Sequence, residues 1–474
     1  MVMGDMEMNT DLLVIGGGPG GYGAAFRAAD LGLDVIMVDP IPRPGGVCLH
    51  KGCIPSKTFL HITELILDAK HAKRMGITFA EPQLDLMAMR AWKEQVIDSM
   101  ADGLVTLAKR RGILLVQGTA RFVSSTTVRI EGADISSVHF KHGIIATGSR
   151  PLELPGVSFS PHGRIMDSAT ALNLADIPQS LLVVGGGYVG LELGSVYAAL
   201  GSQVTLVERE DRLLAQVDTD LVQPLQKRLS KLFSDIQFGV QVDSMKEDNE
   251  GVDVLFKKDG EIEQHRFNRV LVAIGRIPNS EGLGLEQTQV ELDSRGFILI
   301  NDQQQTSDKH LFAVGDVAGG VMLAHKATRE GRVAAEVIGG RNSSFDARTI
   351  PAVVYTDPQI SWCGLTEQQA RTENIPYATQ KFPWKYSGRA QTMGITDGFT
   401  KLLTDPQTGR ILGVGITGRN AEGLISEAAL AIEMGALAED LALTIHPHPT
   451  LSETEAEAAE IFQGSPTHMM PSMK

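Results

Sequence analysis

Cysteine, long apolar runs and basic side chains are all scarce in this sequence, and each scarcity excludes a class of protein. Three cysteines are too few for a disulfide-stapled secreted scaffold, which indicates a reducing compartment. No stretch approaches the roughly 18 consecutive apolar residues that span a membrane. The first ten residues carry acidic side chains and no basic segment followed by an apolar one, so we expect no secretory signal. The sequence therefore predicts a cytoplasmic protein that does not bind membranes.

The charge balance excludes another group of functions. Lysine and arginine total 43 against 57 aspartate and glutamate, a net charge of −14. General binding of nucleic acid or of an anionic membrane requires clustered basic residues, so we expect neither. The same charge is compatible with docking a basic protein partner. With 474 residues, 43% of them hydrophobic, the chain is long enough for about three domains with buried cores.

Glycine, by contrast, is abundant, and its placement is informative. The 50 glycines make up about a tenth of the chain, against roughly 7% in average proteins. A cluster of them at 16–21 follows the apolar run 11–15 and precedes a helix of small residues that should end near Gly32. A second apolar run, 35–38, then closes on Asp39. This strand–turn–helix–strand order predicts a Rossmann-like dinucleotide-binding unit.

The same unit returns 169 residues later in the chain. A strand at 181–184 leads into glycines at 185–190, a helix that runs to Leu200, and a strand that closes on Glu208. One glycine-rich hexamer occurs easily by chance. Two of them, each after a strand and each with an acidic residue 23 positions on, are a specific signal. We therefore expect two dinucleotide folds in one chain.

Each glycine turn would bring backbone N–H groups and a helix N-terminus to a pyrophosphate. Asp39 and Glu208 stand where a carboxylate accepts hydrogen bonds from a ribose, and at a nicotinamide site Glu208 would favour NAD over NADP. The alternative is that the glycines serve only the close packing of helix on sheet. The residues expected to form the two phosphate cradles are Gly16, Gly18 and Gly21, and Gly185, Gly187 and Gly190.

Two of the three cysteines, Cys48 and Cys53, lie five positions apart in a glycine-rich segment. They can approach each other on one turn of helix. A disulfide between them would close a small ring and should be reducible rather than stabilising. The alternative is two ordinary buried thiols, which is also our expectation for Cys363.

A second candidate site lies near the C-terminus, where prolines flank His448 and bar a helix before Thr450. Imidazole titrates in the range required of a general base for a thiol. Glu453 allows two interpretations: a carboxylate that orients the imidazole, or the N3 residue of a capping box whose N-cap is Thr450. The residues alone do not separate these two roles.

Turn-rich segments at 150–156, 276–279 and 339–344 divide the chain. The region after the last of them begins with an alternating strand pattern at 352–355 and contains a helical pattern over 421–443. We expect this last region to have an α+β fold.

Several motifs together resemble those of the FAD-dependent pyridine nucleotide–disulfide oxidoreductases. They are the Cys48–Cys53 pair followed by Ile-Pro-Ser-Lys57, the two nucleotide folds, Ala-Thr-Gly at 146–148, and the apolar run that ends at Asp316. The resemblance covers residues 10–462 and is strongest to members that oxidise protein-bound dihydrolipoamide.

The resemblance implies an α/β fold with two Rossmann-like dinucleotide-binding domains, the NAD domain being inserted in the FAD domain. A C-terminal α+β dimerisation domain would complete the chain. The implied FAD domain consists of residues 10–152 and 278–348, the NAD domain of 153–277, and the dimerisation domain of 349–474.

The resemblance also implies a role for each candidate residue. Cys53 would lie against the flavin as the charge-transfer thiolate, and Cys48 would exchange with the substrate. Lys57 and Glu192 would pair near the flavin; otherwise they are a surface lysine and a solvated helix glutamate. The base of the reaction would be His448 of the other subunit, oriented by Glu453. No metal is expected, and further cofactor contacts are expected from Thr147, Gly148, Gly275, Asp316 and Ala324.

The implied activity is NAD-dependent oxidation of protein-bound dihydrolipoamide to lipoamide, through the cysteine disulfide and FAD. The implied partners are a second copy of the chain, lipoyl domains and the E2 core of a 2-oxoacid dehydrogenase complex. Glutathione reductase is one alternative, because Arg209 and Arg212 lie close to Glu208 and the phosphate of NADPH needs basic residues. A flavin-bound docking subunit is another, although the intact set of candidate catalytic residues speaks against it.

Three positions depart from the family pattern or allow two interpretations. Asp39 stands where the family more often has glutamate, so its reach to the ribose is an open point. Lys51, between the two cysteines, would either lower a thiol pKa or point to solvent, and we expect solvent. Tyr188, in the second glycine turn, would either cover the nicotinamide pocket or pack in the core.

Overall fold

The first sheet of the computed structural model, which describes residues 6–470, is built around a strand buried on both faces. In this strand, β1 (Met6–Ile15), the four residues before the glycine turn are at most 4% exposed. It pairs in parallel with β2 (Val35–Asp39) and with β6 (Ile135–Ile145), and α1 (Pro19–Asp30) connects β1 to β2. β1 begins at Met6 rather than at the predicted residue 11, because Met6–Thr10 extend the pairing with β6.

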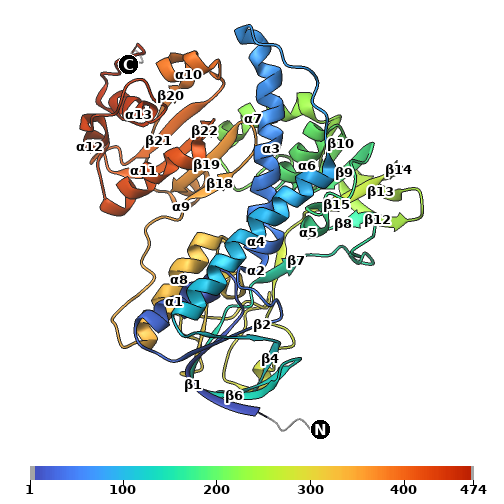
Figure 1. Ribbon diagram of the computed structural model, residues 1–474. Coiled ribbons are helices and arrows are strands. Elements are labelled where there is room, and N and C mark those ends of the chain that lie inside the picture. The colour runs from blue at the N-terminus through green and yellow to red at the C-terminus, as the bar shows by residue number, and fades with distance from the viewer. Residues whose placement is uncertain (1–5, 471–474) are drawn as a thin grey trace.

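A late segment of the chain completes this first sheet. Its strand order is β3-β2-β1-β6-β5-β4, and β17 (Leu311–Ala313) pairs with β6 in parallel. The helix that follows, α8 (Ala324–Ile338), packs on α1, as Figure 1 shows. Because the whole second sheet lies between β6 and β17 in sequence, the second dinucleotide fold is inserted within the first, as expected. The remaining strands of the first sheet are β3 (Leu114–Gln117), β4 (Thr119–Ser124) and β5 (Thr127–Glu131).

The second sheet repeats the arrangement of the first. Its order is β11-β10-β9-β15-β8 and all its pairings are parallel. A three-stranded antiparallel sheet, β12-β13-β14, lies beside it. The parallel strands of the second sheet are β8 (Ile165–Met166), β9 (Ser180–Val184), β10 (Gln203–Glu208), β11 (Asp235–Phe238) and β15 (Arg269–Val272). The unit also contains α5 (Ser168–Ala171), α6 (Tyr188–Leu200), α7 (Thr219–Leu232), β12 (Gln241–Glu247), β13 (Val252–Lys258) and β14 (Glu261–Phe267).

The two connections between these units run side by side. β7 (Ser149–Pro151) enters the second unit and β16 (Arg276–Pro278) leaves it, and the two form an antiparallel pair. A single two-stranded ribbon therefore joins the second unit to the first.

The C-terminal lobe is an antiparallel sheet covered by helices, which agrees with the expected α+β fold. The sheet order is β18-β19-β22-β21-β20. One helix was predicted over 421–443, but the structure has two, because the chain turns at Gly435 with a φ of +70°. The strands are β18 (Ala352–Val354), β19 (Gln359–Gly364), β20 (Ala378–Pro383), β21 (Phe399–Thr404) and β22 (Ile411–Gly418). The helices are α9 (Glu367–Glu373), α10 (Gly388–Met393), α11 (Ala421–Met434), α12 (Ala438–Leu443) and α13 (Glu453–Gln463).

A buried lysine joins the second unit to this lobe. Lys401 of β21 is 1% exposed, and its Nζ donates to Asp218 at 2.7 Å, Asp220 at 2.8 Å and Glu367 at 3.0 Å. Asp218 and Asp220 lie at the start of α7, and Glu367 begins α9. The lysine occupies the space between the three carboxylates and offsets part of their negative charge.

Three further helices connect the parts: α2 (Gly46–Lys51), α3 (Cys53–His71) and α4 (Leu86–Arg110). In Figure 1, α3 runs upward from the centre of the molecule, between the second unit and the C-terminal lobe. One apolar cluster joins Phe59 of α3 to Leu191 of α6 and Ile360 of β19, so α3 shares a core with both neighbours. No helix within residues 6–470 has the length and apolar character to cross a bilayer.

Candidate active site

Packing accounts for the first and third glycine of each turn. Gly16 and Gly185 have φ angles of +104° and +108°, which side-chain-bearing residues rarely adopt. A Cβ on Gly21 would lie 1.8 Å from the carbonyl oxygen of Gly16, and one on Gly190 would lie 2.2 Å from that of Gly185. These four glycines therefore allow helix and strand to approach closely, as the alternative interpretation held.

Packing does not account for the middle glycine of either turn. Gly18 and Gly187 are the N-caps of α1 and α6, with ordinary φ angles of −71° and −79°. A Cβ on Gly187 would meet no atom within 4 Å, and the nearest neighbour of one on Gly18 is 3.9 Å away. Glycine at these positions keeps open the space before a helix N-terminus, where a phosphate is favoured. Both turns thus fit a dinucleotide pyrophosphate.

The two acidic residues make matching contacts beside the turns. Gly17 N donates to Asp39 Oδ2 at 2.6 Å, and Gly186 N donates to Glu208 Oε2 at the same distance of 2.6 Å. Burial raises the pKa of Asp39, although two backbone N–H groups oppose this. Although its side chain is shorter, Asp39 therefore contacts its glycine turn at the same distance as Glu208 contacts the second turn.

The basic residues near Glu208 are engaged elsewhere. Arg209 pairs with Glu210 at 3.1 Å, and Arg212 donates to Thr219 at 3.0 Å and to Gln368 at 2.9 Å. Arg212 is thus bound to other parts of the chain, whereas Arg209 is 76% exposed and makes only a surface ion pair. In the second turn Tyr188 is 41% exposed, so it is not packed in the core.

The cysteine pair lies at a helix break, with Cys48 in one helix and Cys53 at the start of the next. α2 ends at Lys51, Gly52 interrupts the helical dihedrals with φ −142° and ψ −107°, and α3 begins at Cys53. Both Cys48 and Cys53 are free thiols, with Cys53 the more exposed. Lys51 is exposed, as predicted.

The two thiols differ in acidity. A hydrogen bond from Cys48 and the charge of Lys57 lower the pKa of Cys53 to about 7, against the effect of burial. Donation of that hydrogen bond, together with burial, raises the pKa of Cys48. In the reduced pair, Cys53 therefore carries the thiolate and Cys48 the proton.

Lys57 is held by a buried carboxylate. Its Nζ lies 2.7 Å from Glu192 Oε2, and the Glu192 side chain is only 4% exposed. Tyr355 N donates to the other carboxylate oxygen at 3.0 Å, and the Lys57 ammonium lies 4.4 Å from the centroid of the Tyr355 ring. The expected pair is formed, so Glu192 is not the solvated residue of the alternative interpretation. Tyr355 contacts both members of the pair, and no motif in the sequence marked it as part of the site.

The other predicted cofactor residues lie where the first unit meets the second. Asp316 accepts a hydrogen bond from Ser149 of β7, and Thr147 Oγ1 donates to the carbonyl oxygen of Asn279 at 2.7 Å. Gly148 and Gly275 have φ angles of +71° and +133°. Ala324 is the first residue of α8.

Glu453 contacts both His448 and Thr450, but it is the first residue of α13 and not the N3 residue of a capping box. His448 Nδ1 lies 2.8 Å from Glu453 Oε1, and Thr450 N donates to Glu453 Oε2 at 2.6 Å. Burial opposes ionisation of Glu453, but Thr450 and His448 together lower its pKa. The predicted capping box is only half present: α13 starts at Glu453 with Ser452 as its N-cap, and Thr450 Oγ1 donates to Pro447 O instead.

This histidine is not brought to the cysteines within one chain. α13 lies in the C-terminal lobe at the upper left of Figure 1, whereas α2 lies at the centre. Across residues 6–470, no hydrogen bond or ion pair links His448 or Glu453 to Cys48 or Cys53. A single chain therefore holds the two parts of the predicted site at separate places.

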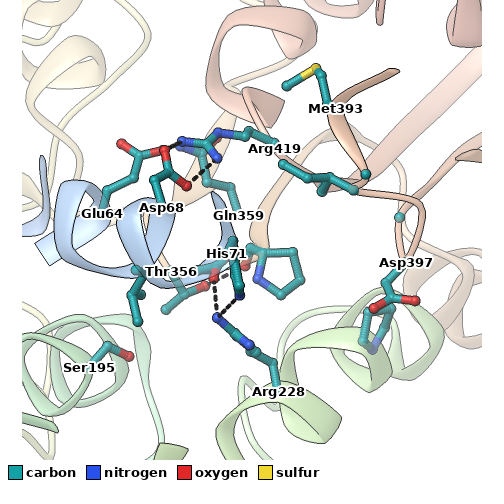
Figure 2. A pocket seen from close by; sticks show the side chains of 18 of the residues that line it. Glu64, Asp68, His71, Ser195, Arg228, Thr356, Gln359, Met393, Asp397 and Arg419 are labelled. Atoms are coloured by element: carbon teal, nitrogen blue, oxygen red, sulfur yellow. Dashed lines mark hydrogen bonds and ion pairs between the residues drawn. The ribbon is translucent and has the colours of Figure 1, made fainter. Parts of the chain in front are cut away.

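A cavity of about 1550 Å³ lies between α3, α7 and the C-terminal lobe. Figure 2 shows two clusters of charge on its wall. Arg419 donates to Asp68 at 2.7 Å and to Glu64 at 2.6 Å, and Arg228 donates to Asp357 at 3.0 Å. Lys57 and Tyr355 also line the cavity, but neither the cysteines nor the glycine turns do. These ion pairs hold three parts of the chain around one cavity.

Comparison with known proteins identifies the family. Residues 10–331 match the pyridine nucleotide-disulphide oxidoreductase family, and residues 350–459 match the dimerisation domain of pyridine nucleotide-disulphide oxidoreductases. Dihydrolipoyl dehydrogenase of Vibrio parahaemolyticus is 44% identical over 467 residues, which cover 98% of each chain. That of Geobacillus stearothermophilus is 44% identical over 471 residues, covering 99% of this chain and all of the other.

Solved structures share the fold at lower identity. LpdA from Mycobacterium tuberculosis is 26% identical with a TM-score of 0.88, over 95% of this chain and 99% of its own. The HOCl-induced flavoprotein disulfide reductase RclA from Escherichia coli is 25% identical with a TM-score of 0.84, over 96% and 99%. The chain thus belongs to the pyridine nucleotide–disulphide oxidoreductase family, with dihydrolipoyl dehydrogenases as full-length relatives.

Proposed function

We propose that this protein oxidises protein-bound dihydrolipoamide to lipoamide and passes the electrons through the Cys48–Cys53 disulfide and FAD to NAD⁺. It would do so as the E3 component of a 2-oxoacid or related dehydrogenase complex. The observation that carries this proposal is the 44% identity with dihydrolipoyl dehydrogenases along 98% of the chain. The unequal acidity of the two thiols, beside the Lys57–Glu192 pair, supplies the chemistry.

The chain's own residues carry out dithiol exchange. His448 takes a proton from one dihydrolipoyl thiol, and the resulting thiolate attacks Sγ of Cys48 in the disulfide. The Cys48–Cys53 bond breaks and Cys53 leaves as a thiolate, stabilised by Lys57. The second substrate thiol then attacks the substrate sulfur of the mixed disulfide. Lipoamide is released, Cys48 leaves, and the proton of that second thiol passes to Cys48.

The two glycine turns would hold the cofactors: FAD at Gly16, Gly18 and Gly21, NAD at Gly185, Gly187 and Gly190. Bound FAD would supply the redox chemistry by which the Cys48–Cys53 dithiol returns to the disulfide and its electron pair reaches NAD⁺. Asp39 and Glu208 would accept the ribose hydroxyls. The FAD domain would comprise 10–152 and 278–348, the NAD domain 153–277 and the dimerisation domain 349–474. Contacts to the flavin would come from Thr147, Gly148, Asp316 and Ala324, and Gly275 would border the nicotinamide site.

A homodimer explains the separation of His448 from the cysteines. The match to a dimerisation domain at 350–459 supports it. In such a dimer, His448 of one subunit would serve the cysteine pair of the other. Lipoyl domains would deliver the substrate, and the E2 core would hold the dimer.

One assay tests the proposal: dihydrolipoamide with NAD⁺, beside NADPH with glutathione disulfide. We expect turnover in the first reaction only, because the Glu208 carboxylate at the second glycine turn would repel the 2′-phosphate of NADPH. Activity in the second alone would overturn the assignment in favour of a glutathione reductase. Flavin binding without turnover in either would favour a docking subunit.

A further inference from the structure

The loop between α12 and α13 carries two histidines in opposite environments. The His446 side chain is 6% exposed, whereas that of His448 is 70% exposed. All the other residues from Leu443 to Pro449 are exposed as well, Ile445 by 96%. Within this stretch, His446 is thus the one residue whose side chain is enclosed by the protein.

The ring of His446 is engaged at both nitrogens. Nδ1 lies 2.8 Å from the carbonyl oxygen of Thr444, and Nε2 lies 2.8 Å from Glu427 Oε1. A carbonyl oxygen only accepts, so Nδ1 donates to Thr444 O, and Nε2 faces the carboxyl group of Glu427. With both nitrogens occupied, His446 cannot receive a proton from substrate. His448 has Nδ1 on Glu453, and its Nε2 has no protein partner within residues 6–470.

A second carboxyl group, that of Glu455, lies close to Glu427. Glu455 of α13 is fully buried, and neither of its oxygens has a hydrogen-bond partner in the described structure. Burial and the charge of Glu427 raise the pKa of Glu455 well above its usual range. Glu455 therefore favours its neutral form, and Glu427 is the carboxyl group that binds His446.

We propose that His446, held by Glu427, is a positioning residue for His448. It ties the loop to α11, while Glu453 ties His448 and Thr450 to α13, so the base is attached on both sides. Two attachments reduce the number of orientations that His448 samples, and proton transfer depends steeply on orientation. The inference rests on the proposed function, because that function gives His448 its role.

The test uses His446→Ala in the full-length, FAD-loaded protein. We expect kcat for dihydrolipoamide oxidation to fall roughly ten- to hundredfold, as for other residues that orient a functional group. KM for NAD⁺ should not change. Electron transfer from NADH to ferricyanide bypasses dithiol exchange, so its rate should stay at the wild-type value. Glu427→Ala should show the same pattern, and His446→Gln should recover part of kcat because its amide can still donate to Glu427.

Glu455→Gln is the matched control, since it replaces the other carboxyl group that faces Glu427 and leaves the pair intact. It should keep kcat within about twofold, as expected for replacing a neutral carboxyl group by an amide. Wild-type kcat in His446→Ala would overturn the inference, and so would a parallel fall of the ferricyanide rate. Hydrogen–deuterium exchange of 444–450 should accelerate in His446→Ala whatever the substrate, and unchanged exchange would also overturn it. A wild-type enzyme inactive with dihydrolipoamide would overturn the proposed function instead.

Discussion

Lys57 Nζ donates a 2.7 Å hydrogen bond to Glu192 Oε2, and this bond joins α3 of the first unit to α6 of the second. The charge of Lys57 lowers the pKa of Cys53. The same contact thus links the two units and supports the thiolate.

Replacing Lys57 should therefore move the titration of Cys53. A depressed pKa keeps the thiolate present down to lower pH, so Lys57→Met should raise that pKa and shift the thiolate–flavin absorption band to higher pH. The measurement is a pH titration of the band in the reduced enzyme. Lys51→Met is the control, because Lys51 is exposed, and it should titrate as the wild type does. Equal titrations in both variants would contradict the role of Lys57.

The two cysteines should respond differently to replacement. Cys48→Ser keeps a donor beside Cys53, so it should retain bound FAD and the thiolate–flavin band near neutral pH. Cys48→Ala lacks that donor, and its band should titrate at higher pH. Cys53→Ser should lose the band altogether. Absorbance spectra with and without dithiol check these outcomes, and full lipoamide turnover in any of the three variants would refute the assignment.

The glycines of the second turn offer a test of ligand binding against packing. Gly187→Ala adds a Cβ in open space, so it should fold normally and raise KM for NAD⁺ about tenfold, which corresponds to about 1.4 kcal/mol of binding. Gly190→Ala would place its Cβ 2.2 Å from the Gly185 oxygen and should lower the free energy of unfolding by roughly 1–3 kcal/mol. Steady-state kinetics and urea denaturation separate the two effects. A Gly187→Ala enzyme with unchanged KM would mean that no phosphate lies there.

The buried lysine at the junction with the C-terminal lobe should matter for stability. Lys401→Met leaves the carboxylates of Asp218, Asp220 and Glu367 without their shared cation, at a cost of about 3–5 kcal/mol. Lys381→Met is the matched control: Lys381 also pairs with Asp220 but is 44% exposed, so it should cost about 0–1 kcal/mol. Chemical denaturation measures both, and equal losses would contradict the importance of burial.

The parts of the fold that could be predicted are those whose residues lie close together in the sequence. A strand, a glycine turn and a helix are adjacent in sequence, so both dinucleotide folds and their acidic residues could be located. The break between α11 and α12 escaped prediction because Gly435 adopts the left-handed conformation without disturbing the apolar pattern around it. The early start of β1 escaped because it depends on β6, more than a hundred residues away.

The contacts of the site were harder to foresee. Tyr355 meets Glu192 across 163 positions of sequence, and no local pattern marks such a meeting. His446 and His448 each precede a proline, and burial distinguishes the anchored ring from the exposed one. Glu453 was assigned two exclusive roles, although its two oxygens allow one carboxylate to serve both His448 and Thr450.

The antiparallel pairing of β7 with β16 places both ends of the second unit next to each other. Arg276 faces Pro151 and Pro278 faces Ser149, so a short linker could close the excised unit on itself without changing its path. A gene segment encoding such a unit can enter or leave a host chain while the host sheet stays intact. The second unit is accordingly an insertion whose two ends meet in one place, so the first sheet can close without it.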